Sequence, residues 1–237
     1  MAFTVQTIYR PLFKIWRAKR FQLFCRTFGL SPESATTSGV TVLDVGGWPG
    51  DWVSRPRVVA HIDTLNLTRP QYDPTQHPER SLQVLVGDGC AMAFADDAYD
   101  IAYSNSVIEH LGTWKRQQQF ASEMERVGRG VWCQTPAFGC PIEPHYMALF
   151  IHWLPKKLQR MLLRRFTPMG LISRLTPKMA DRWIAETRLL SKREMRKLFP
   201  GCTIRTEFLI PWIIPKSYIA YRAAPLREAG EGHEATS

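Results

Sequence analysis

The chain has 237 residues and an apolar fraction of 45%, which suit one folded α/β domain and exclude a wholly disordered protein. Its formal net charge of +10 favours an anionic neighbour such as nucleic acid, a membrane surface or a phosphorylated substrate, although a solvated basic face accounts for it equally well. No apolar run approaches the roughly 18 residues of a membrane span, and no signal peptide is recognisable, so we expect a cytoplasmic protein. The cysteines form no metal-ligand cluster, which predicts reduced thiols.

Residues 8–29 mix aromatic and aliphatic side chains with Lys and Arg, which predicts a basic amphipathic helix, broken or begun near Pro11, within residues 1–30. One interpretation is a helix that covers an edge of the domain or the mouth of its pocket. The other is a helix that binds an anionic membrane surface, peripherally, or an acidic partner. Residues 30–39 are polar and predict a linker.

The central stretch begins with an apolar run at 41–43 that ends at Asp44 and then turns through glycines. Residues 58–67, 81–86, 99–104 and 131–134 predict further strands, and 117–127 has the spacing of a helix. The gap between the first two strands is too short for a long helix, so we expect a crossover made mostly of loop. Strands that alternate with helices or loops indicate a parallel, doubly wound sheet.

Residues 137–190 interrupt this alternation and predict a helical insertion or cap rich in aromatic and basic side chains. Ser191 and Glu194 fit a capping box at the start of a short helix. Residues 203–210 and 217–222 predict a final antiparallel pair at the sheet edge. The polar segment 223–237 predicts a disordered tail.

Polar side chains follow several predicted strands where each strand ends, namely Asp44, Asn66, Asp88, Ser104 and Asn105. In an open α/β sheet a ligand binds outside the carboxyl ends of the strands, so these groups are expected to converge. Glycines after the first strand let the backbone turn sharply and approach that ligand. The turn is not a P-loop, because no Gly-Lys-Ser/Thr follows it, and it is not a clean GxGxxG fingerprint.

Three segments carry a resemblance to a known family: VLDVGGWPG (42–50), LVGDGCAMAFADDAYDIAYSNSVIEHL (85–111) and VWCQTP (131–136). In this order they resemble class I methyltransferases that use S-adenosyl-L-methionine (SAM), and more narrowly a type 11-like bacterial subgroup of unknown substrate. The resemblance implies a domain over residues 40–222 with a Rossmann-like, seven-stranded, mostly parallel sheet, a helical cap insertion, and SAM as cofactor.

Residue by residue, the resemblance implies that Gly46, Gly47 and Gly50 admit the methionine part of SAM, and that Asp44 supports the turn or binds the ammonium group. Asn66 stands where the family has a carboxylate that binds the ribose. Its amide can still form a hydrogen bond, without charge assistance.

Further along the chain, Asp88 would accept a hydrogen bond from the adenine amino group, with the Gly89 backbone beside it. Ser104 and Asn105 would close the site near the transferable methyl group. Trp48 replaces the family's second glycine, and it would either narrow the methionine end of the pocket or pack outward over Trp52.

If the acceptor is a hydroxyl, a general base assists the transfer. The candidates are His110, after the fourth strand, and Glu143 and His145, after the fifth; alternatively each of them orders a loop. We expect a small-molecule or lipid-linked acceptor. Nucleic acid is not expected, since no RNA-binding module is visible.

The alternative is a non-catalytic methyltransferase-like protein whose basic helices bind a membrane surface or a partner. Trp48 and Asn66, the departures from the family pattern, favour it.

Overall fold

The computed structural model describes residues 5–37, 39–143, 148–167, 170–171 and 175–225. Its sheet has seven strands in the order β3-β2-β1-β4-β5-β9-β8. The first five are parallel, and β9 pairs antiparallel with both β5 and β8. This confirms the predicted Rossmann-like, mostly parallel sheet. The strands are β1 (Thr41–Val45), β2 (His61–Asn66), β3 (Leu82–Val86), β4 (Tyr99–Asn105), β5 (Gly128–Pro136), β8 (Thr203–Ile210) and β9 (Ile214–Arg222).

Strand β5 begins three residues earlier than predicted, at Gly128 rather than at residue 131. Glycine disfavours a strand by propensity, but Gly128 pairs with Tyr99 of β4, whereas the pairing of β5 with β9 begins at Val131. A Cβ at Gly128 would lie 2.5 Å from the backbone nitrogen of Ala102, so the close approach of β4 requires glycine there.

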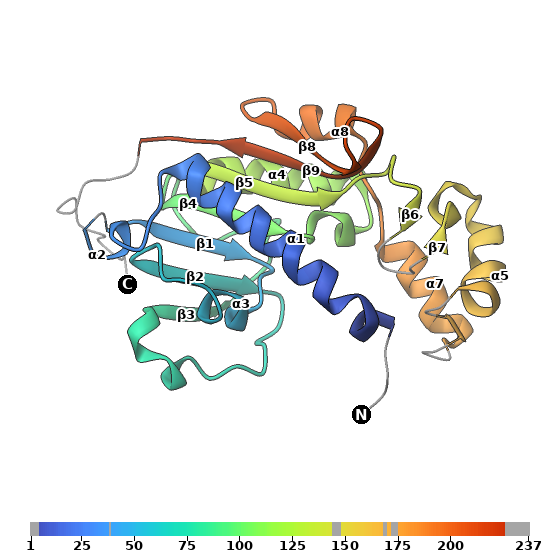
Figure 1. The fold of residues 1–237 in the computed structure, drawn as a ribbon, viewed down its shortest axis with the longest axis horizontal. Helices are drawn as coiled ribbons and strands as arrows, with labels where there is room; N and C mark the ends of the chain where they lie inside the picture. The colour runs from blue at the N-terminus through green and yellow to red at the C-terminus, as the bar shows by residue number, and fades with distance from the viewer. Residues whose placement is uncertain (1–4, 38, 144–147, 168–169, 172–174, 226–237) are drawn as a thin grey trace.

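Helix α1 (Val5–Phe28) lies across one face of the sheet (Figure 1). Pro11 lies inside the helix, so the expected break there is wrong; one missing N–H near the start removes a single backbone hydrogen bond without ending the helix. Phe24 is fully buried against Trp52, Tyr103 and Trp132. The aromatic residues in the second half of α1 therefore cover a face of the sheet, rather than the edge or the pocket mouth of the first interpretation.

A buried ion cluster fixes α1 to the β8–β9 hairpin. Arg20 donates to Glu207 at 2.8 and 3.1 Å and to Gln134 at 2.8 Å, and the Ser217 hydroxyl also donates to Glu207. Burial alone would raise the pKa of Glu207, but Arg20 and Lys216 beside it lower that pKa overall. The helix is thereby held next to the end of β5.

The opposite face of the sheet is covered by η3 (Ile108–Leu111), α4 (Trp114–Val127) and α8 (Lys192–Leu198). The predicted capping box is present, with Ser191 as the N-cap of α8. The crossover between β1 and β2 contains only the short helix α3 (Pro49–Val53), as expected from its length. The connections also contain α2 (Ser34–Thr37), η1 (Pro74–Gln76) and η2 (Pro78–Arg80).

Beyond the carboxyl ends of the parallel strands lies the cap (Figure 1). It comprises β6 (Ile142–Glu143), β7 (Ala148–Leu149), η4 (Ile151–Trp153), α5 (Lys156–Phe166) and α7 (Pro177–Glu186). It has a small core of its own, centred on Leu163 and Ile184, and an ion pair of 2.7 Å between Arg160 and Asp181 joins α5 to α7. Most of the expected tail, residues 226–237, lies outside the described residues. Within the described residues no helix is both long and apolar enough to span a membrane.

Candidate active site

The glycine turn after β1 is the centre of the site. Gly46 has φ +78°, in the left-handed region that favours glycine, and its N–H donates to the Leu65 carbonyl at 2.7 Å. A Cβ at Gly47 would lie 1.8 Å from Asp44 Oδ2, which is impossible for any larger residue without a shift. The backbone of the turn therefore wraps closely around the Asp44 carboxylate.

Asp44 itself is 3% exposed. Trp52 Nε1 donates to its Oδ2 at 2.7 Å, whereas Oδ1 has no hydrogen-bond partner among the described residues. Burial raises the pKa of this carboxyl to about 7, although the Trp52 bond opposes the shift. A buried carboxylate oxygen without a hydrogen-bond partner lowers the stability of the folded state. An ammonium or hydroxyl donor from a ligand would supply the missing hydrogen bond. The carboxylate and the glycine cradle thus fit the amino-acid end of SAM.

Trp48 lies on the outside of this turn. Its side chain is half-exposed and makes an edge contact with Tyr72, with ring centroids 6.1 Å apart. Of the two predicted alternatives for Trp48, the structure has the side chain packed outward, but onto Tyr72 rather than onto Trp52. Trp52 is instead buried beneath α1 and bound to Asp44. A Cβ at Gly50 would lie 2.6 Å from the Trp48 indole nitrogen, so glycine is needed to accommodate this indole.

Asn66, at the end of β2, braces the same turn by donating from Nδ2 to the Gly47 carbonyl at 3.1 Å. This bond uses the amide donor and orients the side-chain carbonyl oxygen, which can accept from a hydroxyl. A carboxylate at this position could not donate this hydrogen bond and would repel the Gly47 carbonyl, whereas the Asn66 amide donates to it.

Asp88 follows β3 and is partly exposed. Its Oδ1 accepts from the Cys90 N–H at 2.9 Å, and Arg116 Nη2 contacts both oxygens at 2.9 and 3.0 Å. These bonds, first that from Cys90, lower the pKa of Asp88, so the group is an ionised acceptor at neutral pH. A Cβ at Gly89 would lie 2.7 Å from Val45 Cγ1, which shows how closely this loop approaches the end of β1.

Ser104 and Asn105 end β4 with different orientations. Ser104 is fully buried and donates to the Val45 carbonyl at 2.9 Å, which ties β4 to β1. Asn105 turns toward the α1 face, where it donates to the Tyr103 hydroxyl and accepts from Trp132 Nε1 at 3.4 Å. Ser104 and Asn105 both lie at the carboxyl edge of the sheet, as expected. Their role beside the transferable methyl group stays a prediction.

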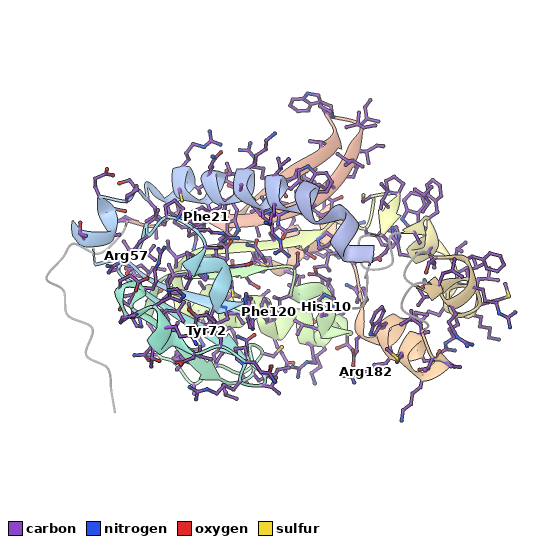
Figure 2. All side chains as sticks on the ribbon, turned by 60° about the horizontal axis from the view of Figure 1, so that its bottom comes forward. Phe21, Arg57, Tyr72, His110, Phe120 and Arg182 are labelled. Atoms are coloured by element: carbon purple, nitrogen blue, oxygen red, sulfur yellow. The ribbon has the colours of Figure 1, made fainter. Side chains whose placement is uncertain are left out.

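The three candidate bases lie after β4 and β5. His110 is partly exposed and lies on the side of the core that faces the cap (Figure 2). Glu143 is fully buried in β6. His145 lies outside the described residues, so the structure does not place it with the other two.

Glu109 is a site residue that the sequence reasoning passed over. Its side chain is fully buried, its Oε2 accepts from the Thr135 hydroxyl at 2.9 Å, and its Oε1 lies 4.0 Å from His110 Nε2. It thereby joins the turn after β4 to the end of β5. In the sequence, Glu109 is visible only as the residue before His110 in SNSVIEHL. Its burial was not predicted, because it depends on Thr135 in a strand more than twenty residues away.

Comparisons with known proteins agree with this geometry. A family model described as a methyltransferase domain matches residues 51–130. An uncharacterized methyltransferase of Mycolicibacterium vanbaalenii is 30% identical over 144 residues, covering 56% of this chain and 54% of that protein. One of Mycobacterium marinum is 32% identical over 107 residues, covering 42% of this chain and 39% of that protein. The chain thus spans about half or less of the length of these relatives.

Among solved structures, a chain from Rhodobacter sphaeroides described as putative Zn-dependent alcohol dehydrogenases is similar with a TM-score of 0.51. The match covers 81% of this chain and 86% of that chain at 15% identity, which shows a shared fold and nothing of its chemistry.

The sheet order, the glycine turn and the polar strand ends define a Rossmann-like α/β domain, of which residues 51–130 match the methyltransferase-domain model. More narrowly, its motifs resemble those of the class I SAM-dependent methyltransferases, and the two bacterial relatives are described as methyltransferases whose substrate is not specified. SAM is the cofactor of this family, and the residues at the strand ends fit it.

Proposed function

We propose that the protein transfers the methyl group of SAM to a small-molecule or lipid-linked acceptor between the carboxyl edge of the sheet and the cap. The observation that carries this proposal is the convergence at one edge of the glycine turn around Asp44, the amide of Asn66 and the carboxylate of Asp88. SAM, when bound, supplies an electrophilic methyl group on a sulfonium sulfur.

On the cofactor side each residue has a role matched to its chemistry. Asp44 Oδ1 would accept from the ammonium group, which satisfies its orphaned oxygen. The Asn66 carbonyl oxygen would accept from a ribose hydroxyl while its amide holds the glycine turn. Asp88, kept ionised by the Cys90 N–H and Arg116, would accept from the adenine amino group.

On the acceptor side, in-line methyl transfer depends mainly on alignment and proximity. We assign His110 as the general base for an acceptor hydroxyl or amine. The buried Glu109 carboxylate, 4.0 Å from the imidazole, would stabilise the imidazolium that forms when His110 takes the proton. Glu109 is then a positioning residue, held by Thr135. Glu143 and His145 remain candidates for acceptor contacts.

The start of the cap favours an acceptor with an apolar part. Phe138, just after β5, and Phe150 and Trp153 are each partly exposed. Trp153 donates from Nε1 to the Phe138 carbonyl at 2.8 Å, which holds this aromatic group against the end of β5. An aromatic surface beside the strand ends can bury an apolar ring or chain of the acceptor.

A direct test is the formation of S-adenosylhomocysteine when the protein is incubated with SAM and cell extract separated into water-soluble and lipid fractions. We expect turnover with one fraction and at least about a hundredfold less with Glu109→Gln. Absence of turnover with both fractions, in protein that binds S-adenosylhomocysteine, would support the non-catalytic alternative instead.

A further inference from the structure

We infer that the tip of the β8–β9 hairpin and a basic groove beside it form a docking surface for an anionic phospholipid membrane. The hairpin tip is defined by Phe208, Ile210, Trp212 and Ile213, and the basic groove by Lys19, Arg26 and Arg205. This inference goes beyond methyl transfer and does not depend on it.

The hairpin tip exposes apolar side chains where a turn in water normally has polar ones. Trp212 is 88% exposed and Ile213 is 73% exposed, and residues 209–215 read LIPWIIP without a polar side chain. Turns at a protein surface usually consist of Gly, Asn, Asp, Ser or Pro. A large exposed aromatic residue in such a turn is explained when its ring is buried in another phase.

The backbone of the tip supports the same conclusion. Trp212 has φ +64°, a left-handed conformation that bulky residues rarely adopt. Its ring packs against Phe208 with centroids 5.8 Å apart, so the two aromatic rings project together. Strained residues are retained where the surroundings make use of them, and an observed outlier is a reason to look for a function.

The basic groove lies between α1 and β8 and is open, with a volume of about 480 Å³. Its three cations form no ion pair within the described residues. Its acid, Glu207, is already neutralised by Arg20 at 2.8 Å and Lys216 at 3.7 Å. The groove is therefore positive, and Phe208 lines it as well, so that the charged and apolar parts are continuous.

An anionic bilayer matches both parts at once. Tryptophan places its apolar ring at the level of the lipid headgroups, and Lys and Arg nearby are attracted to anionic lipid. The hairpin projects outward past α1 (Figure 2). Such a narrow apolar projection enters a fluid interface readily, whereas a protein partner would need a pocket of matching shape. A nucleic acid would account for the cations but not for the isoleucines.

Vesicle flotation of the full chain tests the inference. We expect binding to vesicles of phosphatidylcholine mixed with phosphatidylglycerol that is at least about tenfold tighter than binding to phosphatidylcholine alone. Trp212→Ala combined with Ile213→Ala should lower the binding about tenfold or more, and Trp212→Phe should retain it. Lys19→Gln combined with Arg205→Gln should lower binding to the mixed vesicles only.

The matched control is Phe166→Ala combined with Leu171→Ala, which removes side chains that are 71% and 64% exposed on the cap. This variant should bind vesicles as the unmodified protein does, and circular dichroism should show that all variants are folded. Equal binding of the unmodified protein to both kinds of vesicle would overturn the inference. Unchanged vesicle binding of the Trp212→Ala, Ile213→Ala variant would overturn it as well. If the unmodified protein were a dimer and this variant a monomer, the hairpin tip would be a self-association surface, which would also overturn the inference.

Discussion

The two halves of the site at the carboxyl edge of the sheet are built in different ways. The cofactor half, after β1, β2 and β3, consists of tight backbone turns in which Gly47 and Gly89 allow contacts that a Cβ would block. The acceptor half, after β4 and β5, depends on buried carboxylates, Glu109 and Glu143, and on the cap. The first half is specified by backbone turns that approach their neighbours closely, and the second by buried side chains and the cap. If these roles are as proposed, we expect that the acceptor half can be altered without disturbing cofactor binding.

Among the variants that distinguish the acceptor half from the cofactor half, we expect Glu109→Gln to have the largest effect. Loss of the charge behind His110 should lower kcat by about a hundredfold or more, while affinity for S-adenosylhomocysteine changes less than about threefold. Kinetics with the acceptor found by the extract assay, together with calorimetry, measures both quantities. Glu186→Gln, on the exposed end of α7, is the control and should change neither. A parallel loss of cofactor affinity would contradict the separation.

On the cofactor half, Gly47→Ala should weaken S-adenosylhomocysteine binding by about 10- to 100-fold. The added Cβ would overlap Asp44 Oδ2 and push the turn away from the ligand. The control is Gly29→Ala, since the Cβ that alanine would add there has no atom within 4 Å. If both variants bind equally well, the turn does not approach the ligand closely.

The pH dependence of binding tests Asp44. Because burial raises its pKa to about 7, the carboxylate that accepts from the ammonium group is present above that pH and is lost as the pH falls through it. Affinity for S-adenosylhomocysteine should therefore fall about tenfold between pH 8 and pH 6, and this fall should be absent in Asp44→Asn. Identical pH profiles for the two proteins would show that Asp44 only supports the turn.

The smallest effect is expected at Trp48, although it replaces a family glycine. Since the indole packs outward on Tyr72, Trp48→Ala should change cofactor affinity by less than about threefold. A gain of tenfold or more in calorimetry would mean that the indole obstructs the methionine end of the pocket.

The sequence predicted those parts that depend on local patterns. The alternation of apolar runs and turns predicted the sheet, and the spacing from Asp44 to Asp88 predicted which residues lie at its edge. It did not predict that β5 begins at Gly128, because the pairing of Gly128 with Tyr99 of β4 overrides glycine's weak strand propensity. Nor did it predict the continuous helix through Pro11.

Side-chain contacts that form only in the folded protein were not predicted from the sequence. The bond from Trp52 to Asp44, the turn of Asn105 toward Tyr103 and the burial of Glu109 beside Thr135 each require the folded sheet. The exposure of Trp212 could not be predicted either, since the sequence placed residues 211–216 between two predicted strands but did not show whether their apolar side chains pack against the domain.

The central claim is that the strand ends form a SAM site, and calorimetric titration with S-adenosylhomocysteine tests it most directly. The account predicts micromolar binding that Asp88→Ala weakens about 10- to 100-fold, because an ionised hydrogen-bond acceptor is lost. Asp96→Ala, which removes a 79% exposed carboxylate from the same loop, should bind as the unmodified protein does. Absence of binding, or equal binding by both variants, would contradict the account.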